Sequence, residues 1–299
     1  MVYYIVANPL RITYRAFAKV GYSKFSSGVD PVCVHSCGLR RVFESAALES
    51  IDIHAQFVGL GNYVHLFASQ SFQQALSNTL ILGVGQIVIL LPLGLFLALL
   101  LDMGLRGTRI YRTVMFGPYV LPLVASGLVW TLLYNQNFGL INQVLSWVHI
   151  NGPNWLGTSG FALLAVLIMT VWQYLGYYML IFLGGLQNVS VSLKEAAAID
   201  GANDRQTFWH VTLPALSPSM FFALVICTIQ AFQIFDQVYV MTGGGPDGST
   251  STLVYYIYNE GFQMYNIGTA AAASMVLLIL LALLTWLQVR LGRRWVVEE

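Results

Sequence analysis

Two groups of polar and aromatic side chains interrupt long apolar runs in the second half of the chain, and their types suit a binding site. The first group is Trp172, Gln173, Tyr174, Gly176, Tyr177 and Tyr178, and the second is Gln230, Gln233, Asp236 and Gln237. Polar groups are costly in hydrocarbon and normally face the interior of a helical bundle. Amides and carboxylates hydrogen-bond to hydroxyls, and aromatic faces cover apolar sugar faces. The two groups therefore predict a path for a neutral polyol.

The spacing of the second group adds a geometric expectation. Gln230, Gln233 and Gln237 are three and seven residues apart, which places them on one face of a continuous helix. Asp236 is the only charge in the two groups and lies near the end of its apolar run, which favours a solvated position at a cavity mouth. The alternative for the whole set is that its hydrogen bonds join helices to one another. For any single residue, both interpretations stay open at the sequence level.

A strongly polar interval, residues 190–218, separates two apolar runs of membrane-spanning length. Ser192 followed three residues later by Glu195 predicts a capping box. The alanine-rich residues 193–199 predict a short helix after it. Gly201 then lets the chain turn in the left-handed conformation.

The second half of this interval predicts another short helix. Asn203 and Asp204 are residue types that cap helices, and Pro214 and Pro218 limit its length. The interval therefore predicts a helix–turn–helix between two membrane spans.

Three short motifs in this interval resemble the EAA loop of binding-protein-dependent ABC importer permeases. They are Glu195-Ala196-Ala197, Asp200-Gly201-Ala202 and Thr212-Leu213-Pro214. The wider sequence is similar to the carbohydrate-type subfamily in FVGLGNY (57–63), NFGLINQVL (137–145) and TGGGP (242–246), so the resemblance covers residues 55–295. It implies an all-α polytopic helical bundle of the type I ABC importer permease kind. It also implies that the loop couples the chain to ATPase subunits through Ser192, Glu195, Ala196, Ala197, Asp200, Gly201, Leu213 and Pro214.

The composition agrees with a membrane protein. The chain has 299 residues, of which 57% are hydrophobic and 9% are charged, whereas soluble domains carry about 25% charged residues. A net charge of +1 without a basic tract gives no indication of nucleic-acid binding. Cys33, Cys37 and Cys227 make no disulfide framework. Cys33 and Cys37 flank His35, and we favour incidental residues over a metal site there.

Five apolar stretches are long enough to cross a bilayer as helices: residues 74–101, 113–134, 161–186, 219–241 and 268–289. Pro92, Pro118 and Pro122 lie inside two of them. Proline within a span requires neighbours that bond the freed carbonyls, which favours a packed bundle.

Residues 1–56 contain no stretch of this length. Residues 2–17 resemble the second half of the family's first span, which indicates a missing N-terminus, a misassigned start or a divergent first span. The expected organisation is therefore an N-terminal segment, 1–56, followed by a permease transmembrane domain, 57–299.

The distribution of basic residues orients the chain. Arg106, Arg109 and Arg112 follow the first clear span, Lys194 and Arg205 lie in the interval 190–218, and Arg290, Arg293 and Arg294 are near the end of the chain. Residues 135–160 and 242–267 contain no Lys or Arg. The positive-inside rule places the 190–218 loop and the C-terminus in the cytoplasm, and the resemblance implies a bacterial inner membrane.

A glycine-rich turn lies in the second of these loops. Gly243, Gly244, Gly245 and Pro246 predict a tight irregular turn, because glycine frees φ and proline fixes it. The turn is either an ordinary surface turn or, by the resemblance, a contact for a solute-binding protein.

The sequence contains no GxxxxGK[ST] phosphate loop, so we expect no P-loop ATPase site in this chain. The resemblance implies instead a transport subunit that binds no cofactor or metal itself. Its partners are a second permease, two ATP-binding-cassette subunits that use ATP and Mg, and an extracytoplasmic solute-binding protein. By position in maltose-type permeases, Trp172, Gly176 and Gln233 line the solute site.

A sugar or related polyol is the expected solute. Glycerol-3-phosphate or a glycerophosphodiester is a second candidate within the subfamily. A passive channel or a membrane scaffold is the alternative from a different class.

Overall fold

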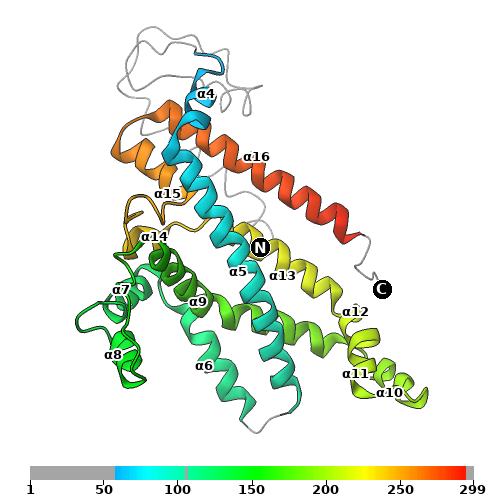
Figure 1. The fold of residues 1–299 in the computed structure, drawn as a ribbon. Helices are drawn as coiled ribbons and strands as arrows, with labels where there is room; N and C mark the ends of the chain where they lie inside the picture. The colour runs from blue at the N-terminus through cyan, green and yellow to red at the C-terminus, as the bar shows by residue number, and fades with distance from the viewer. Residues whose placement is uncertain (1–57, 105–106, 294–299) are drawn as a thin grey trace, which may run out of the picture. The chain divides into compact units, whose positions relative to one another are not determined.

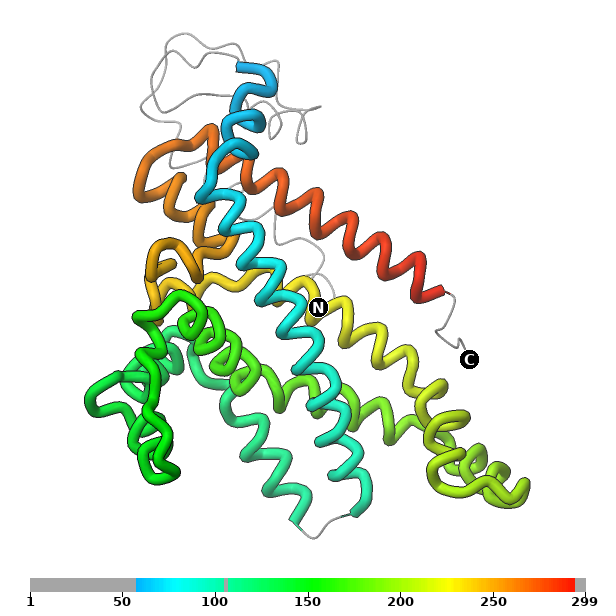
Figure 2. Tube along the Cα trace, viewed as in Figure 1, coloured from blue at the N-terminus to red at the C-terminus, as the bar shows by residue number. Residues whose placement is uncertain are grey.

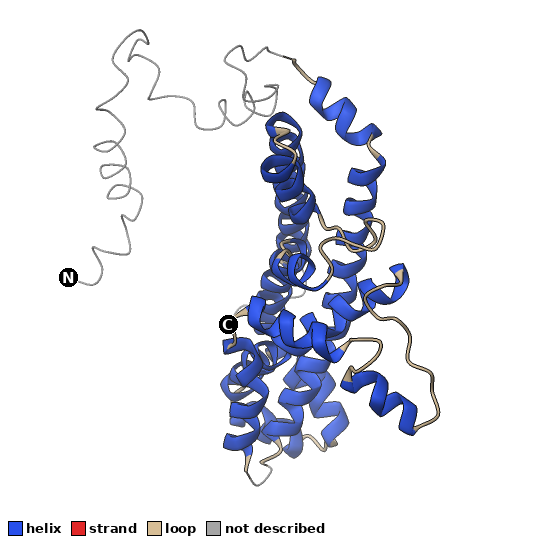
Figure 3. Ribbon diagram, turned by 90° about the vertical axis from the view of Figure 1, so that its left-hand side faces the viewer, coloured by secondary structure: helices blue, strands red, loops and turns tan. Residues whose placement is uncertain are grey.

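The computed structural model describes residues 58–104 and 107–293, and Figures 1 and 2 show them as helices joined by short connections. The long helices are α5 (Gln70–Asp102), α9 (Ser159–Asn188), α13 (Ser217–Phe232) and α16 (Ile267–Gly292). The shorter ones are α4 (Gly61–Ala68), α6 (Thr108–Val120), α7 (Leu123–Leu133), α8 (Leu140–Trp147), α10 (Val191–Ile199), α11 (Asp204–Thr207), α12 (Leu213–Ala215), α14 (Asp236–Met241) and α15 (Leu253–Tyr258), with π-helical turns η2 (Phe208–Thr212) and η3 (Asn259–Gln263). These residues contain no strand (Figure 3).

The predicted spans are found in this part of the chain. Four segments are long and apolar enough to cross a membrane: α5, α9, Ser217–Met241 and α16. The pair α6 and α7 gives a fifth if it is counted as one broken span. The all-helical membrane fold is thus confirmed. The expectations for residues 1–56, including the first span and the Cys33–His35–Cys37 group, lie outside the described residues.

The second predicted span, residues 113–134, is wrong as a single straight helix. It divides into α6 and α7, whose axes are bent by 97°. Leu121 adopts an extended conformation, with ψ of 141°, because a residue that precedes proline is disfavoured in the α region. Pro122 follows as the N-cap of α7 and has no N–H to continue the hydrogen-bond ladder.

A side chain from α9 satisfies the carbonyls at this bend. The amide nitrogen Nε2 of Gln173 donates to the carbonyl oxygens of Pro118 and Leu121, the latter over 3.1 Å. Gln173 is 1% exposed, so its amide is enclosed between α9 and the bend. Non-helical backbone at membrane depth is tolerated only where protein or a water-filled cavity surrounds it. The bend and Gln173 therefore form one structural unit.

The span 219–241 is also interrupted, although no proline or glycine marks the place. α13 ends at Phe232 and α14 begins at Asp236. The hydroxyl of Thr252 donates to the carbonyl oxygen of Ile234 over 2.7 Å, and Thr252 is buried. A long-range side chain thus bonds the backbone at this second break as well.

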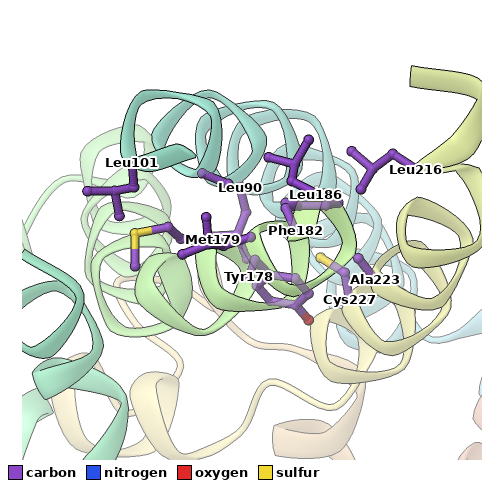
Figure 4. Close-up of a cluster of buried hydrophobic side chains, with 11 residues drawn as sticks. Leu90, Leu101, Tyr178, Met179, Phe182, Leu186, Leu216, Ala223 and Cys227 are labelled. Carbon is purple, nitrogen blue, oxygen red and sulfur yellow. The ribbon is translucent and has the colours of Figure 1, made fainter. Parts of the chain in front are cut away.

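The largest core cluster joins α5, α9 and α13. Its buried residues include Leu90, Tyr178, Met179, Phe182 and Cys227, as Figure 4 shows. Gly94 of α5 brings that helix against Tyr178 and Met179, so the helix axes approach closely. This core holds the middle of α9, which carries the first predicted site group, in a fixed position.

We predict that Gln173→Met lowers the free energy of unfolding by about 1–3 kcal/mol, because the two carbonyls at the bend lose their donor while side-chain volume is kept. The measurement is the thermal unfolding midpoint of the detergent-solubilised protein.

The matched control is Gln187→Met on the same helix, where the side chain is exposed. We expect this control to unfold at the wild-type temperature. Equal unfolding temperatures for the two variants would show that Gln173 does not support the bend.

Candidate functional site

The 190–218 loop begins with α10, but not through the predicted capping box. The N-cap is Ser190, with no side-chain cap bond, so Ser192 is already inside the helix. The hydroxyls of Ser190 and Ser192 bond each other over 2.7 Å. The prediction of a Ser192–Glu195 capping box is therefore wrong, because the helix begins two residues earlier than the prediction assumed. Glu195 is exposed, and its carboxylate does not cap the helix.

The turn after α10 is confirmed at Gly201, whose φ is +79°. The N–H of Gly201 donates to the carbonyl of Ala198 over 3.1 Å, and the N–H of Ala202 donates to the carbonyl of Ala197 over 2.9 Å. These two bonds make a Schellman motif, which needs a left-handed residue at this position. The Glu195-Ala196-Ala197 and Asp200-Gly201-Ala202 motifs thus form one helix and its stop signal.

The predicted second cap is also present. Asn203 Oδ1 accepts from the N–H of Gln206, and Gln206 Oε1 accepts from the N–H of Asn203, both over 2.9 Å. This reciprocal pair is the capping box of the loop. Leu213 and Pro214 follow in α12 as half-buried residues.

The outward surface of this loop is apolar as well as charged. The exposed apolar residues are Val191, Leu193, Ile199 and Trp209, and Ile199 is 86% exposed. No residue of α10 is buried. Large apolar side chains that are exposed on a loop outside the spans are typical of a protein contact.

In the first predicted site group, two residues serve helix packing. Gln173 bonds the α6–α7 bend, as described above. Gly176 lies where α9 crosses α6, and a methyl group there would overlap the carbonyl of Met115. These contacts favour the packing interpretation for Gln173 and Gly176.

The aromatic members of this group form a connected surface. Tyr177 stacks on Tyr119 of α6 with ring centroids 4.6 Å apart and planes at 14°. Tyr119 also meets the edge of Tyr174 at 5.9 Å. Trp172 meets Trp130 of α7 at 5.4 Å and is 37% exposed. The bend thus places two aromatic residues, Tyr119 and Trp130, beside the predicted ones.

In the second group, the expectation of a single helical face is wrong, because the helix ends at Phe232. Gln230 Oε1 accepts from the hydroxyl of Tyr178 over 2.7 Å, while Gln237 is buried in α14. Gln233 lies in the break and is exposed. Asp236 is half-buried at the start of α14. In the second group, Gln233 and Asp236 are therefore the residues that a ligand can reach. In the first group, Trp172 is accessible in the same way.

The glycine-rich turn has the predicted irregular backbone. Gly243 and Gly244 have φ of +56° and +80°. The hydroxyl of Tyr255 donates to the carbonyl of Gly243 over 2.7 Å, and burial raises the pKa of Tyr255, which keeps this donor protonated. Gln74 and Asn78 of α5 donate to carbonyls later in the turn, those of Asp247, Gly248 and Ser251.

Several of these contributors were missed by sequence reasoning. Tyr119 and Trp130 reach the site only through the 97° bend, and Thr252 and Asn78 bond backbone groups far away in sequence. The only local signal was the pair Pro118 and Pro122 on either side of Tyr119.

Residues 90–297 match the family described as binding-protein-dependent transport system inner membrane component. The chain belongs to this family. It is therefore a multi-pass inner-membrane permease subunit of an ABC importer, and its role in such a system is transport. The EAA-like loop and the broken spans described above are features of this permease.

Individual relatives agree. The permease is 39% identical over 255 residues to the sn-glycerol-3-phosphate transport system permease protein UgpA of Yersinia enterocolitica, covering 83% of this chain and 84% of that protein. It is 37% identical over 237 residues to the trehalose/maltose transport system permease protein MalF of Thermococcus litoralis, covering 79% and 80%.

The fold also matches a solved structure of a bacterial ABC transporter involved in the import of alginate. The TM-score is 0.78 at 20% identity, over 98% of this chain and 95% of that one. This likeness shows that the permease shares the fold of an ABC transporter subunit.

We predict that Gly176→Ala destabilises the permease by about 1–3 kcal/mol, because α6 has to move away from the added methyl group. Gly184→Ala is the control on the same helix, since nothing lies within 4 Å of a methyl group there. Thermal unfolding of both variants in detergent gives the comparison. If Gly176→Ala unfolds no earlier than Gly184→Ala, the close α6–α9 crossing is wrong.

Proposed function

We propose that this permease forms one half of a translocation pathway for a carbohydrate or related polyol, and that ATPase subunits drive it through the 190–218 loop. The observation that carries the proposal is α10 with its Gly201 turn. It is a short, rigidly terminated helix with no buried residue and with exposed apolar side chains. Such a helix has the surface needed to dock in a groove of a partner and transmit its movement.

The charge distribution supports a cytoplasmic position for this loop. Among the described residues, Arg109 and Arg112 flank one end of the spans, and Lys194, Arg205 and Arg290 share that side by span counting. Figure 1 shows α10 and α11 at the end of α9 and α13 that is opposite α14 and α15. The positive-inside rule supports a cytoplasmic α10 end. In this proposal the ATPase partners therefore dock at α10 and the solute-binding protein docks at the other end.

Glu195 supplies a specific contact for the ATPase partner. Its side chain is exposed and is not used as the helix cap. A basic residue of the partner can pair with it beside the apolar surface. Ser192, Ala196, Ala197, Asp200, Leu213 and Pro214 serve to shape and present this docking helix. In this proposal ATP and Mg are bound by the partner subunits.

Trp172, Gln233 and Asp236 form this chain's part of the solute path. Trp172 offers a partly exposed aromatic face and Gln233 an exposed amide. α14 packs against α9, so the two groups lie on neighbouring helices. An aromatic surface with hydrogen-bonding groups at its edge suits a sugar ring, and a second permease would complete the cavity.

Glycerol-3-phosphate is the second candidate solute, because the sequence is 39% identical to a protein named for its transport. The segments 172–178 and 230–237 contain one charge, Asp236, and no cation. A phosphate ester beside this carboxylate would need cationic groups from the partner permease. This charge pattern favours the neutral solute for the present chain.

We predict a graded loss of coupling when Gly201 is replaced. Gly201→Asn should retain most activity, because asparagine adopts the left-handed conformation. Gly201→Ala adds about 1–2 kcal/mol of backbone strain, and Gly201→Val should be more severe. The measurement uses proteoliposomes that contain the complete transporter. In Gly201→Ala, solute uptake and solute-stimulated ATPase activity should fall together by about 5–30-fold, and in Gly201→Val both should fall further.

No side chain lies within 4 Å of a methyl group at Gly201, so steric overlap does not explain a loss. A passive channel or scaffold would keep full uptake in all three variants. That result would contradict the proposed ATP coupling.

We predict that Gln233→Ala and Asp236→Asn each raise the KM for uptake about three- to tenfold. Gln233→Ala removes a hydrogen bond to the solute of about 1 kcal/mol, and Asp236→Asn replaces a charge-assisted hydrogen bond with a weaker neutral one. Uptake assays with maltose, trehalose and sn-glycerol-3-phosphate compare the candidate solutes. If the wild-type transporter takes up sn-glycerol-3-phosphate in preference to maltose and trehalose, the neutral-solute proposal fails.

A further inference from the structure

A polar cavity of about 480 Å³ lies beside the glycine-rich turn, at the end of the described helices opposite the 190–218 loop. The turn Gly243–Gly245 forms one wall, and the start of α5 and the residues of α15 and η3 form the others. The polar side chains in these walls are Ser71, Gln74, Ser251, Tyr255, Tyr256, Asn259 and Glu260. None of the roles derived above uses this cavity.

The walls of the cavity are held by hydrogen bonds that do not involve a ligand. Gln74 and Asn78 bond the carbonyls of the turn from α5, and Tyr255 bonds the carbonyl of Gly243 from α15. Gly244 lets the turn lie directly on the ring of Tyr255, where a methyl group would overlap that ring. The cavity is therefore preformed, which lowers the cost of binding.

Glu260 is the one ionisable carboxylate in the wall. Its Oε2 accepts from Asn266 Nδ2 over 2.8 Å, and no Lys or Arg of the described residues forms an ion pair with it. A half-buried carboxylate with a neutral partner gains more from an incoming cation than an exposed one, because the pair is less screened by salt.

The charged residues around the cavity have the same negative sign as Glu260. Residues 233–267 contain Asp236, Asp247 and Glu260 but no Lys or Arg. Residues 135–160 contain no Asp, Glu, Lys or Arg. All fixed charges of the described loops at this end are thus negative. An anionic ligand is disfavoured here, and a basic protein surface is complementary.

We propose that this cavity receives a lysine or arginine side chain of the solute-binding protein, with Glu260 as its counter-charge. The proposal rests on the importer function proposed above. The cationic group of the incoming side chain bonds Glu260, and its remaining N–H groups donate to the side-chain oxygens of Asn259 and Ser251. The glycine-rich turn thereby acts as a cavity wall as well as a contact surface.

The test uses the complete transporter in lipid nanodiscs with its own loaded binding protein. The concentration of binding protein that gives half-maximal ATPase stimulation is measured at low and high salt. We expect Glu260→Gln to raise this concentration about tenfold and Glu260→Lys to raise it further. The salt dependence should become weaker in Glu260→Gln.

Asp247→Asn is the matched control. Asp247 is exposed on the same turn and is not part of the cavity wall. We expect its half-saturating concentration to stay within about twofold of wild type, since exposed charge pairs contribute little.

A photo-crosslinking amino acid at Met264, on the cavity wall, identifies the occupant directly. The proposal expects crosslinks to a peptide of the binding protein that contains Lys or Arg. Crosslinks to residues 1–57 of this chain would overturn it, because the chain's own basic segment would then fill the cavity.

The kinetic outcomes separate this inference from the function on which it rests. If wild type is stimulated and both Glu260 variants behave like wild type, the cavity proposal fails and the importer proposal stands. A change in the KM for solute without a change in half-saturation would assign the cavity to the solute and also overturn the proposal. If loaded binding protein does not stimulate wild type, both proposals fall.

Discussion

Backbone groups that a helix break leaves free have no water to bond to in hydrocarbon, and this constraint governs the described spans. The permease meets it with side chains from distant helices. Gln173 of α9 bonds the carbonyls at the α6–α7 bend, and Thr252 bonds Ile234 at the α13–α14 break. Each break is thus tied to another part of the chain. The helices can bend without exposing unpaired backbone, and the bends define where the site can form.

Both breaks also shape the proposed solute path. The first turns α7 so that Trp130 reaches Trp172, and the second leaves Gln233 exposed with Asp236 next to it. Residues that serve helix packing and residues that remain open therefore lie close together along α9 and α13–α14. This explains why one sequence segment contains both helix-packing groups, such as Gln173 and Gln230, and proposed solute contacts. The 190–218 loop lies at the far end of α9 and α13. In the proposed mechanism, a movement of α10 would therefore act on these two helices directly.

The extent of the spans and the short helices of the loop could be predicted from the sequence, because hydropathy and turn residues are local properties. The Gly201 turn and the Asn203 cap were correct for this reason. The break at Gln233 could not be predicted, since no proline or glycine marks it and a bond from Thr252 stabilises it. The capping register failed because Ser190 and Ser192 are equivalent by type. The sequence shows that Gly176 is small, but only the packed structure shows that α6 needs the space.

The central claim is that this permease works as one subunit of an ATP-driven importer. The most direct measurement is mass spectrometry of the proteins that remain with it after gentle extraction from its native membrane. The account predicts recovery of a P-loop ATPase and a second permease with an EAA-like loop, in defined stoichiometry. A chain recovered alone or as a homo-oligomer, in several detergents and without an ATPase, would contradict the claim and favour a passive channel.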